Sequence, residues 1–309
     1  MKTGSHRIVG GARATELQIP AGDGRLLGAT IFAPAEPSGQ EHPVTVLASA
    51  TGVKRGFYDA YALFLAEGGL HVISFDYRGI GGSRSGALGS FRATAREWGE
   101  LDLNGVLTWV MARFPGERVG IVGHSIGGQI LGLAPAAAQA DRVLLISAQS
   151  GYWPLFDAPL KYLYALLWYA GIPVLTRMFG FLPAKRLGLG EDLPAGVAQE
   201  WAQWCRTPGY LIEALDDPAV QARYASVRLP ILAYSASDDP MAPPRAVDAL
   251  LSLYRNADVE RRHIYPRDVG LDSIGHFGFF RNSARGVLWE ETRRWLGGAG
   301  IGSPEGARV

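Results

Sequence analysis

Short apolar segments, set off by Gly, Pro or Asp, recur along the chain. Some alternate apolar and polar residues with a period of two and others are continuously apolar, and both patterns predict β-strands. Segments such as VTVLASA and VLLIS are apolar on both faces, which is typical of a parallel sheet covered by helices on both sides. The predicted strands are 15–19, 26–32, 44–50, 71–75, 119–122, 143–147, 231–235 and 259–265.

From the third strand onward, stretches with apolar residues at i, i+3 and i+4 separate the strands, which predicts amphipathic helices. One of them contains Pro135 and should be kinked or shortened there, because proline lacks the N–H that a helix interior needs. Strands that alternate with helices predict an open α/β fold. The predicted helices are 57–67, 97–114, 126–138, 244–254 and 284–296.

One connection breaks this alternation. About 80 residues separate the strand that ends at Ser147 from the strand that starts at Ile231, whereas a usual connection has about 2–6 residues. We predict an inserted helical cap with helices at 159–170 and 195–205. The predicted domains are a core of residues 1–148 and 227–297, a cap of residues 149–226, and a flexible Gly-rich tail of residues 298–309.

The cap is rich in large apolar side chains and holds four of the eight tryptophans. Because a small insertion cannot bury so much apolar surface within itself, we expect these side chains to bury against the core or a ligand. The alternative is a contact between two copies of the chain. The residues in question are Tyr152, Trp153, Leu160, Leu163, Leu166, Leu167, Trp168 and Phe179.

Composition and charge narrow the function classes. The 309 residues include 30 Lys and Arg against 29 Asp and Glu, a net charge of +1, with no run of five like charges. That balance argues against nucleic acid or an anionic membrane as the main partner. The single cysteine, Cys205, excludes an internal disulfide and a Cys-based zinc site. The most apolar stretch, 162–175, is too short to span a bilayer, and without a recognisable secretory signal we expect a cytoplasmic protein.

The strongest local motif is Gly-His-Ser-Ile-Gly at 123–127, between a predicted strand and a predicted helix. A G-x-S-x-G turn in that context lifts a serine hydroxyl above the sheet and places it at a helix N-terminus, where free N–H groups favour an oxyanion. We expect a strained backbone at Ser125, and no room for a Cβ at Gly123 or Gly127. The alternative is a turn that merely caps a helix.

A serine nucleophile needs a base, and the base needs an acid that orients it. Among six histidines we choose His276, in a glycine-flanked loop after the last strand; His263 lies in a strand pattern and is expected on its solvent face. The acid should follow the strand 231–235, where Asp238 and Asp239 are adjacent. We choose Asp239 and expect Asp238 to cap the turn. The alternatives are a structural histidine and two turn carboxylates.

Two backbone N–H groups should form an oxyanion hole, that of Ile126 after the serine and that of Val53 in the loop after the third strand. The segment DYRGIGGS at 76–83 is glycine-rich, but it lacks the G-x-G-x-x-G pattern and the lysine of a phosphate loop. We therefore predict a turn held by Asp76 and Arg78. No metal or cofactor is implied.

The chain order Ser125, Asp239, His276, with the DYRGIGGS turn and the GHSIGG elbow, resembles the α/β-hydrolase fold over residues 13–297. ATGV, EWGELDL, GHSIGGQILGL, GLGEDLPAGVAQEW and IGHFGFFR resemble, more narrowly, a bacterial group of predicted serine α/β-hydrolases of unassigned substrate. The resemblance implies an eight-stranded, mostly parallel sheet with helices on both faces and a helical cap inserted after the sixth strand. Thr51-Gly52 departs from the common His-Gly of the family's oxyanion loop.

We predict a serine hydrolase that forms an acyl-enzyme at Ser125 and acts on carboxylic esters with small to medium apolar acyl groups. The expected partner is a small acyl substrate, and a homodimer contact through the cap is a further option. Amidase, peptidase, thioesterase or acyltransferase activity would use the same triad, and a non-catalytic binding protein on this fold is the alternative from another class. The expected substrate contacts are Tyr152, Trp153, Trp168 and Phe277.

Overall fold

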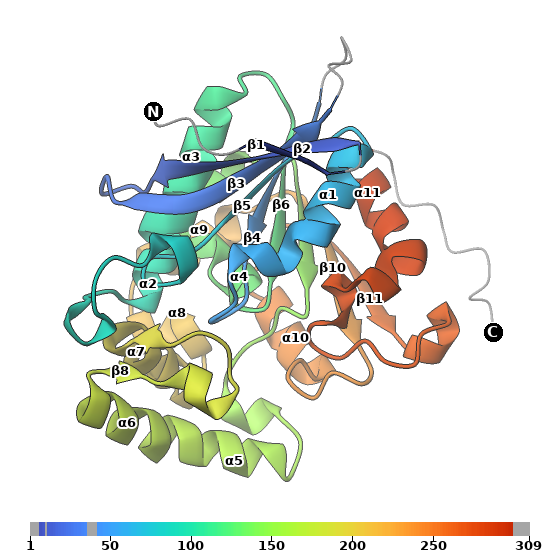
Figure 1. Ribbon diagram of the computed structural model, residues 1–309. Helices are drawn as coiled ribbons and strands as arrows, with labels where there is room; N and C mark the ends of the chain where they lie inside the picture. The colour runs from blue at the N-terminus through green and yellow to red at the C-terminus, as the bar shows by residue number, and fades with distance from the viewer. Residues whose placement is uncertain (1–5, 10, 36–41, 299–309) are drawn as a thin grey trace.

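The computed structural model describes residues 6–9, 11–35 and 42–298. They form a central sheet with helices on both faces and a further layer of helices beyond one end of the strands (Figure 1). The sheet has the order β1-β2-β3-β5-β4-β6-β7-β10-β11. Its strands are β1 His6–Val9, β2 Ala12–Pro20, β3 Leu26–Pro34, β4 Val44–Ala48, β5 His71–Phe75, β6 Val119–His124, β7 Arg142–Ile146, β10 Pro230–Ala236 and β11 Asp258–Ile264.

The sheet is mostly parallel, as predicted. Strands β4 to β7, β10 and β11 pair in parallel, while β3 pairs antiparallel with β2 and β5. All eight predicted strands are present. Strand β1, which was not predicted, adds a ninth at the edge by pairing antiparallel with β2. The carboxyl ends of the parallel strands therefore share one edge of the sheet, where an α/β fold places its site.

Helices cover both faces of the sheet because its strands are apolar on both faces. In β6, Ile121 packs into one hydrophobic core and its neighbour Val122 into the other. The first core includes α3 (Asn104–Arg113) and α10 (Pro244–Leu251). The second includes α1 (Asp59–Glu67) and α11 (Glu290–Leu296). No helix among the described residues is both long and apolar enough to cross a membrane.

The helix predicted at 126–138 is wrong in its length. Helix α4 covers only Ile126–Gln129, and 3-10 turns follow at Leu131–Leu133 and Pro135–Gln139. Pro135 begins the second turn, where its missing N–H costs nothing. Gly132 lies under the ring of Tyr224, where a Cβ would be 2.5 Å from the ring. Two poor helix formers therefore stop the helix after one turn.

The inserted segment, for which we keep the name cap (residues 149–226), is mostly helical. A continuous helical stretch consists of α5 (Leu160–Leu166), a π-helical segment (Leu167–Gly171) and α6 (Ile172–Phe179). A small hairpin of β8 and β9 follows. The remaining elements are β8 Phe181–Leu182, β9 Leu193–Pro194, α7 Ala195–Arg206, α8 Tyr210–Leu215 and α9 Pro218–Ser226.

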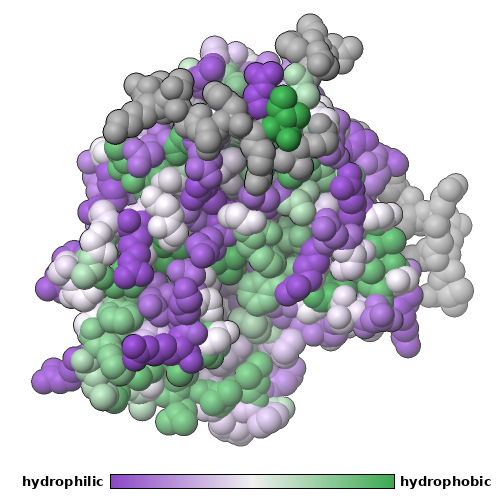
Figure 2. All heavy atoms as spheres, viewed as in Figure 1, coloured by the Kyte–Doolittle hydropathy of each residue, from purple (hydrophilic) through white to green (hydrophobic). Residues whose placement is uncertain are grey.

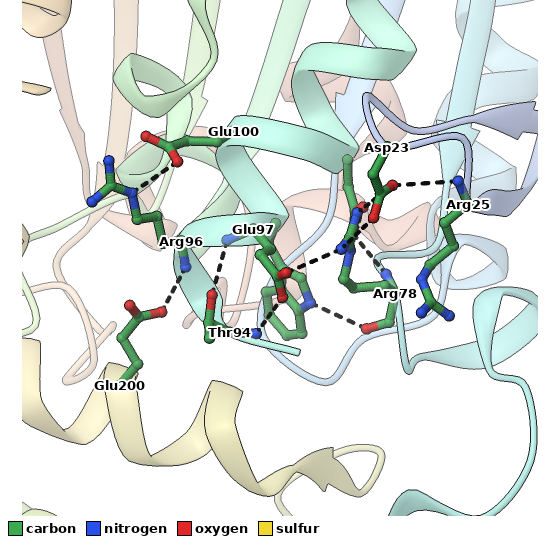
Figure 3. Close-up of polar contacts among 10 residues, drawn as sticks. Asp23, Arg25, Arg78, Thr94, Arg96, Glu97, Glu100 and Glu200 are labelled. Atoms are coloured by element: carbon green, nitrogen blue, oxygen red, sulfur yellow. Dashed lines mark hydrogen bonds and ion pairs between the residues drawn. The ribbon is translucent and has the colours of Figure 1, made fainter. Parts of the chain in front are cut away.

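Polar contacts attach the cap to the core through Arg96 on α2 (Ala95–Glu97). Its backbone N–H donates to Glu200 of α7 (2.7 Å) and its guanidinium pairs with Glu100 (2.8 Å) (Figure 3). The same guanidinium also pairs with Asp217 (2.7 Å). The first of these bonds joins backbone to a side chain, so the N-terminus of α2 and the middle of α7 are held at a fixed separation. The α7 side of the cap therefore faces the core.

The turn at 76–83 is held by Asp76 and Arg78, as predicted. Asp76 accepts the N–H groups of Arg55 (2.7 Å) and Gly82 (2.8 Å). Arg78 is buried and donates from its backbone N and from Nε to Asp102 (2.8 and 2.7 Å), with Asp23 on its outer side (Figure 3). Breaking a buried pair of this kind costs about 3–5 kcal/mol, so the turn is firmly fixed.

Of the large apolar residues of the cap that were expected to bury against the core or a ligand, three do not bury against the core. Leu163 is 60% exposed, Leu166 is 64% exposed and Phe179 is 40% exposed. Trp168, in contrast, is buried. The helical stretch is apolar around most of its circumference, so one apolar face packs inward while another faces solvent. The predicted flexible tail lies, from residue 299 onward, outside the described residues.

Candidate active site

Ser125 lies in a strained turn between β6 and α4, as predicted. Its backbone has φ 53° and ψ −117°, and its N–H donates to Ile146 of β7 (3.0 Å). A Cβ on Gly123 would lie 2.7 Å from the backbone of Gly128, and one on Gly127 would lie 2.2 Å from the carbonyl oxygen of Ala48. Only glycine fits at both positions, and the turn holds the serine at the carboxyl edge of the sheet.

His276 and Asp239 meet as predicted. Asp239 follows β10, His276 follows β11, and the Nδ1 of His276 is 2.8 Å from Oδ2 of Asp239. The other oxygen of Asp239 accepts the N–H of Met241 (2.9 Å), which orients the carboxylate. Because a carboxylate accepts, Nδ1 carries the proton and Nε2 is left as the basic nitrogen.

The three residues are almost closed off from solvent. Ser125, Asp239 and His276 are 7%, 3% and 6% exposed. The hydroxyl of Ser125 forms no hydrogen bond with any described residue. Such bonds often form only with substrate in place. The serine turn is connected to His276 through the neighbouring residue His124, whose Nε2 lies 2.9 Å from the carbonyl oxygen of His276.

Asp238 has a structural role that differs from the expected one. Instead of capping its own turn, it accepts the N–H groups of Ile274 (2.9 Å) and Gly275 (3.0 Å), the two residues before His276. The two adjacent carboxylates thus hold the His276 loop at two points. Asp238 binds the backbone of the loop, and Asp239 binds the imidazole of His276. The partners of Asp238 lie 36 and 37 residues along the chain, and no local signal in the sequence points to them.

His124 and Tyr58 form a buried network that sequence reasoning missed. The N–H of Ala50 donates to the Tyr58 hydroxyl (2.9 Å), this hydroxyl lies 2.8 Å from Nδ1 of His124, and Nε2 of His124 lies 2.9 Å from the carbonyl oxygen of His276. Burial lowers the pKa of His124 well below its usual value, so the ring is neutral. The carbonyl can only accept, so Nε2 carries the proton and Nδ1 accepts from Tyr58. The loop after β4 is thereby tied to the loop of His276.

One of the two predicted oxyanion donors is wrong. The N–H of Ile126 is at the start of α4, where helix geometry leaves it without a partner. The N–H of Val53, however, donates to the carbonyl of Ala50 (3.1 Å) and closes a turn. Gly52 adopts φ 67° within that turn. The hydroxyl of Thr51 in the same loop is buried and has no hydrogen-bond partner among the described residues.

Of the four expected substrate contacts, Phe277 lies beside the triad, with its ring centroid 5.1 Å from that of His276. Trp168 is buried against Trp201 (4.8 Å) and Tyr164 (5.9 Å) inside the cap. Tyr152 and Trp153 are half-buried and have no ring contact with the triad among the described residues. As substrate contacts, all four stay predictions.

Tyr164 of α5 was not singled out from the sequence. Burial, together with the nearby charge of Asp239, raises the pKa of Tyr164 to about 12. Its ring packs against Phe156 (4.8 Å between centroids) and the buried Trp168 (5.9 Å), so the side chain lies on the inner face of the cap. Helical spacing could have indicated that Tyr164 lies on the same face as Trp168, since it precedes Trp168 by one turn.

His263 was expected on the solvent face of its strand, but its side chain is half-buried. Its Nδ1 is 2.8 Å from the hydroxyl of Ser235 on β10. It therefore has a structural partner away from the triad. Among the described residues, no group of three His, Cys, Asp or Glu side chains could hold a metal ion.

Two hollows in the surface of the described residues, of about 610 and about 440 Å³, are lined by residues other than Ser125, Asp239 and His276. The larger lies on the cap between α6 and α7, and the smaller lies near Arg55 and Asp76. Ser125, Asp239 and His276 each expose less than a tenth of their surface to solvent.

Residues 45–287 match the family described as the alpha/beta hydrolase family. No curated protein matches the chain. Among solved structures, a hypothetical protein from Pseudomonas aeruginosa is similar, with 13% identity and a TM-score of 0.63 over 94% of this chain and 95% of that one. An esterase from Pyrococcus furiosus has 15% identity and a TM-score of 0.57 over 96% of both chains. A carboxyl esterase from Bacillus coagulans has 16% identity and a TM-score of 0.58 over 92% and 98%. At these identities the likeness concerns the fold alone.

Proposed function

Because the chain belongs to the alpha/beta hydrolase family, we propose that it is a serine hydrolase that works by acyl transfer, with a carboxylic ester as substrate. The observation that carries the proposal is the 2.8 Å contact of Asp239 with His276, next to a serine held at φ 53° at the end of β6. Esterases among the similar structures agree with this choice of substrate class, by analogy of fold.

The chemistry follows from the hydrogen-bonding roles. Nε2 of His276 takes the proton of Ser125 Oγ as Oγ attacks the acyl carbon, and Asp239 stabilises the imidazolium. The N–H of Ile126 and the loop at Thr51-Gly52 receive the negative oxygen of the tetrahedral intermediate. His276 then protonates the leaving alcohol. Water, deprotonated by the same nitrogen, attacks the acyl-enzyme and releases the acid with Ser125 restored.

A panel of p-nitrophenyl esters of rising acyl length tests the substrate class. If the inner face of the cap lines an acyl pocket, each added buried methylene contributes up to about 0.8 kcal/mol, so kcat/KM should rise from acetate toward butyrate or hexanoate and then fall. Trp153→Ala and Tyr164→Ala should flatten that rise, since both remove apolar surface from the cap. A preference for acetate that neither variant changes would remove the cap from the acyl site.

The same panel should include amide and thioester analogues of the preferred acyl group. The triad chemistry serves all three bonds, and an amide is the hardest of the three to cleave. Faster turnover of the thioester or the amide at equal acyl length would replace ester hydrolysis by thioesterase or amidase activity. Accumulation of a new ester when an alcohol is added would indicate acyl transfer.

Tyr58→Phe should lower kcat about tenfold with little change in KM. The substitution leaves the Ala50 N–H and His124 Nδ1 without a partner, and each lost buried bond costs about 1–3 kcal/mol. Tyr61→Phe is the matched control, because Tyr61 is equally buried on α1 and its hydroxyl bonds Thr292 (2.8 Å), away from the triad. Both variants should lower Tm, and equal kcat values would mean that the Tyr58 network only supports the fold.

A further inference from the structure

The outer face of the cap is apolar over its whole length. From Leu160 to Phe179 the helical stretch of α5 and α6 forms the layer farthest from the sheet (Figure 1). Figure 2 shows apolar residues gathered along this edge of the molecule. We call this surface the cap stripe; six of its side chains are 52–69% exposed, namely Tyr162, Leu163, Leu166, Tyr169, Val174 and Met178. So much exposed apolar surface in one place marks an interaction site.

Basic residues without partners border the cap stripe. Between residues 158 and 190 the chain has four basic residues, Lys161, Arg177, Lys185 and Arg186, and no acidic one. This stretch therefore carries +4, so the rest of the chain, at a total of +1, carries −3. Within the described residues, Lys161, Arg177 and Arg186 form no ion pair. The net charge of the whole chain conceals this local excess of basic residues. A low net charge therefore does not argue against an anionic partner for this surface.

A hollow of about 610 Å³ opens at the side of the cap stripe. Arg177 of α6 and Arg206 of α7 line it, with Gln199 and Gln203. The guanidinium of Arg206 lies 5.4 Å from the ring of Tyr169, a member of the stripe, and forms no ion pair within the described part of the chain. Nε of Arg206 donates to the carbonyl oxygen of Ala202 (3.1 Å), so the hollow presents two guanidinium groups without an ion pair, that of Arg206 with its other N–H groups still able to donate.

The one carboxylate in the hollow, Glu200, is engaged with the core. It accepts the N–H of Arg96 (2.7 Å) on the side where the cap meets α2. The guanidinium groups are therefore left to bind an anion from outside. Phosphate is the anion that the planar guanidinium fits best, through paired N–H donors.

We propose that the cap stripe docks on an anionic phospholipid surface, with the stripe in the acyl region and a lipid phosphate between Arg177 and Arg206. An apolar helical face bordered by basic side chains is the arrangement that binds in the plane of a membrane interface. A second copy of the chain fits less well, because a two-fold contact through the stripe would bring the basic side chains Lys161 and Arg177 of both copies together. The proposal is independent of the reaction that Ser125 carries out.

The test uses flotation of the full chain with vesicles of phosphatidylcholine alone and of an equimolar mixture with phosphatidylglycerol. We expect binding to the mixed vesicles, weakened by salt, and little binding to phosphatidylcholine. Arg177→Gln with Arg206→Gln should weaken binding about 30-fold, since each basic group near an anionic surface contributes about fivefold. Leu163→Ser with Leu166→Ser should weaken it at least about tenfold.

Matched controls lie on the core. Val287 is 46% exposed and Arg255 is exposed, so Val287→Ser and Arg255→Gln repeat the same chemical changes away from the stripe and should leave binding unchanged. The substituted side chains are exposed except for the half-buried Arg206, so Tm should stay within a few degrees. The arginine pair and the leucine pair are separate tests of the stripe, so one remains usable if the other variant folds poorly.

Four results would overturn the proposal. Equal binding to both kinds of vesicle would remove the charge argument, and wild-type binding by both double variants would place the lipid contact elsewhere. A dimer in solution that Leu163→Ser with Leu166→Ser converts to a monomer, without vesicle binding by the wild type, would assign the stripe to a second copy. Loss of binding in Ser125→Ala would also contradict it, because that variant leaves the stripe intact.

Discussion

Ser125→Ala is expected to abolish labelling by a fluorophosphonate and to lower ester turnover by about 10⁴- to 10⁶-fold. The reagent phosphonylates an activated serine, and without Oγ neither that adduct nor an acyl-enzyme can form. The close contacts around Gly123 and Gly127 impose φ 53° at position 125 whether the residue is serine or alanine, so the variant should stay folded. Gel-based labelling and initial rates on the preferred p-nitrophenyl ester measure the two effects.

Two histidine variants make the result specific. His276→Ala should be nearly as severe as Ser125→Ala, because Ser125 loses its base. His263→Ala should stay within a few-fold of the wild type, because the partner of His263 is Ser235 and not a member of the triad. Full labelling of Ser125→Ala would show that another residue reacts, and the reverse histidine pattern would show that His276 is not the base.

Asp239→Asn should lower kcat by about 10⁴-fold. The carboxylate holds the proton on Nδ1 of His276 at 2.8 Å, and an amide that turns its NH₂ toward the ring favours the wrong tautomer and cannot stabilise the imidazolium. KM should change little, since Asp239 is buried behind the imidazole. Rates at saturating ester, with Tm measured beside them, separate lost chemistry from lost folding.

Asp238→Asn is the neighbouring comparison. The amide oxygen can still accept one of the two N–H groups that Asp238 holds, from Ile274 or Gly275, but its NH₂ cannot accept the other. We therefore expect a loss of about tenfold through a looser His276 loop, far less than for Asp239. If Asp238→Asn proves the more harmful of two folded variants, the acid has been assigned to the wrong carboxylate.

The strands, the elbow at Ser125 and the pairing of Asp239 with His276 could be predicted from the sequence. A buried strand needs an unbroken apolar run, and all eight such runs became strands of the sheet. The turn at Ser125 needs glycine at 123 and 127 because backbone atoms occupy the space of a Cβ, and that requirement is visible as a motif. The acid and base follow strands 10 and 11, and strand ends are visible in the same pattern.

Contacts between distant segments were decided only by the tertiary structure. Whether the Val53 N–H is available depends on a turn closed by Ala50, and the parts of Asp238 and His124 depend on backbone groups of the His276 loop, which the sequence does not place beside them. Periodicity also could not orient α5 and α6, because a helix that is apolar around most of its circumference has no single buried face. Only docking of the cap on the core, through contacts such as Arg96 with Glu200, left Leu163 and Leu166 on the outside.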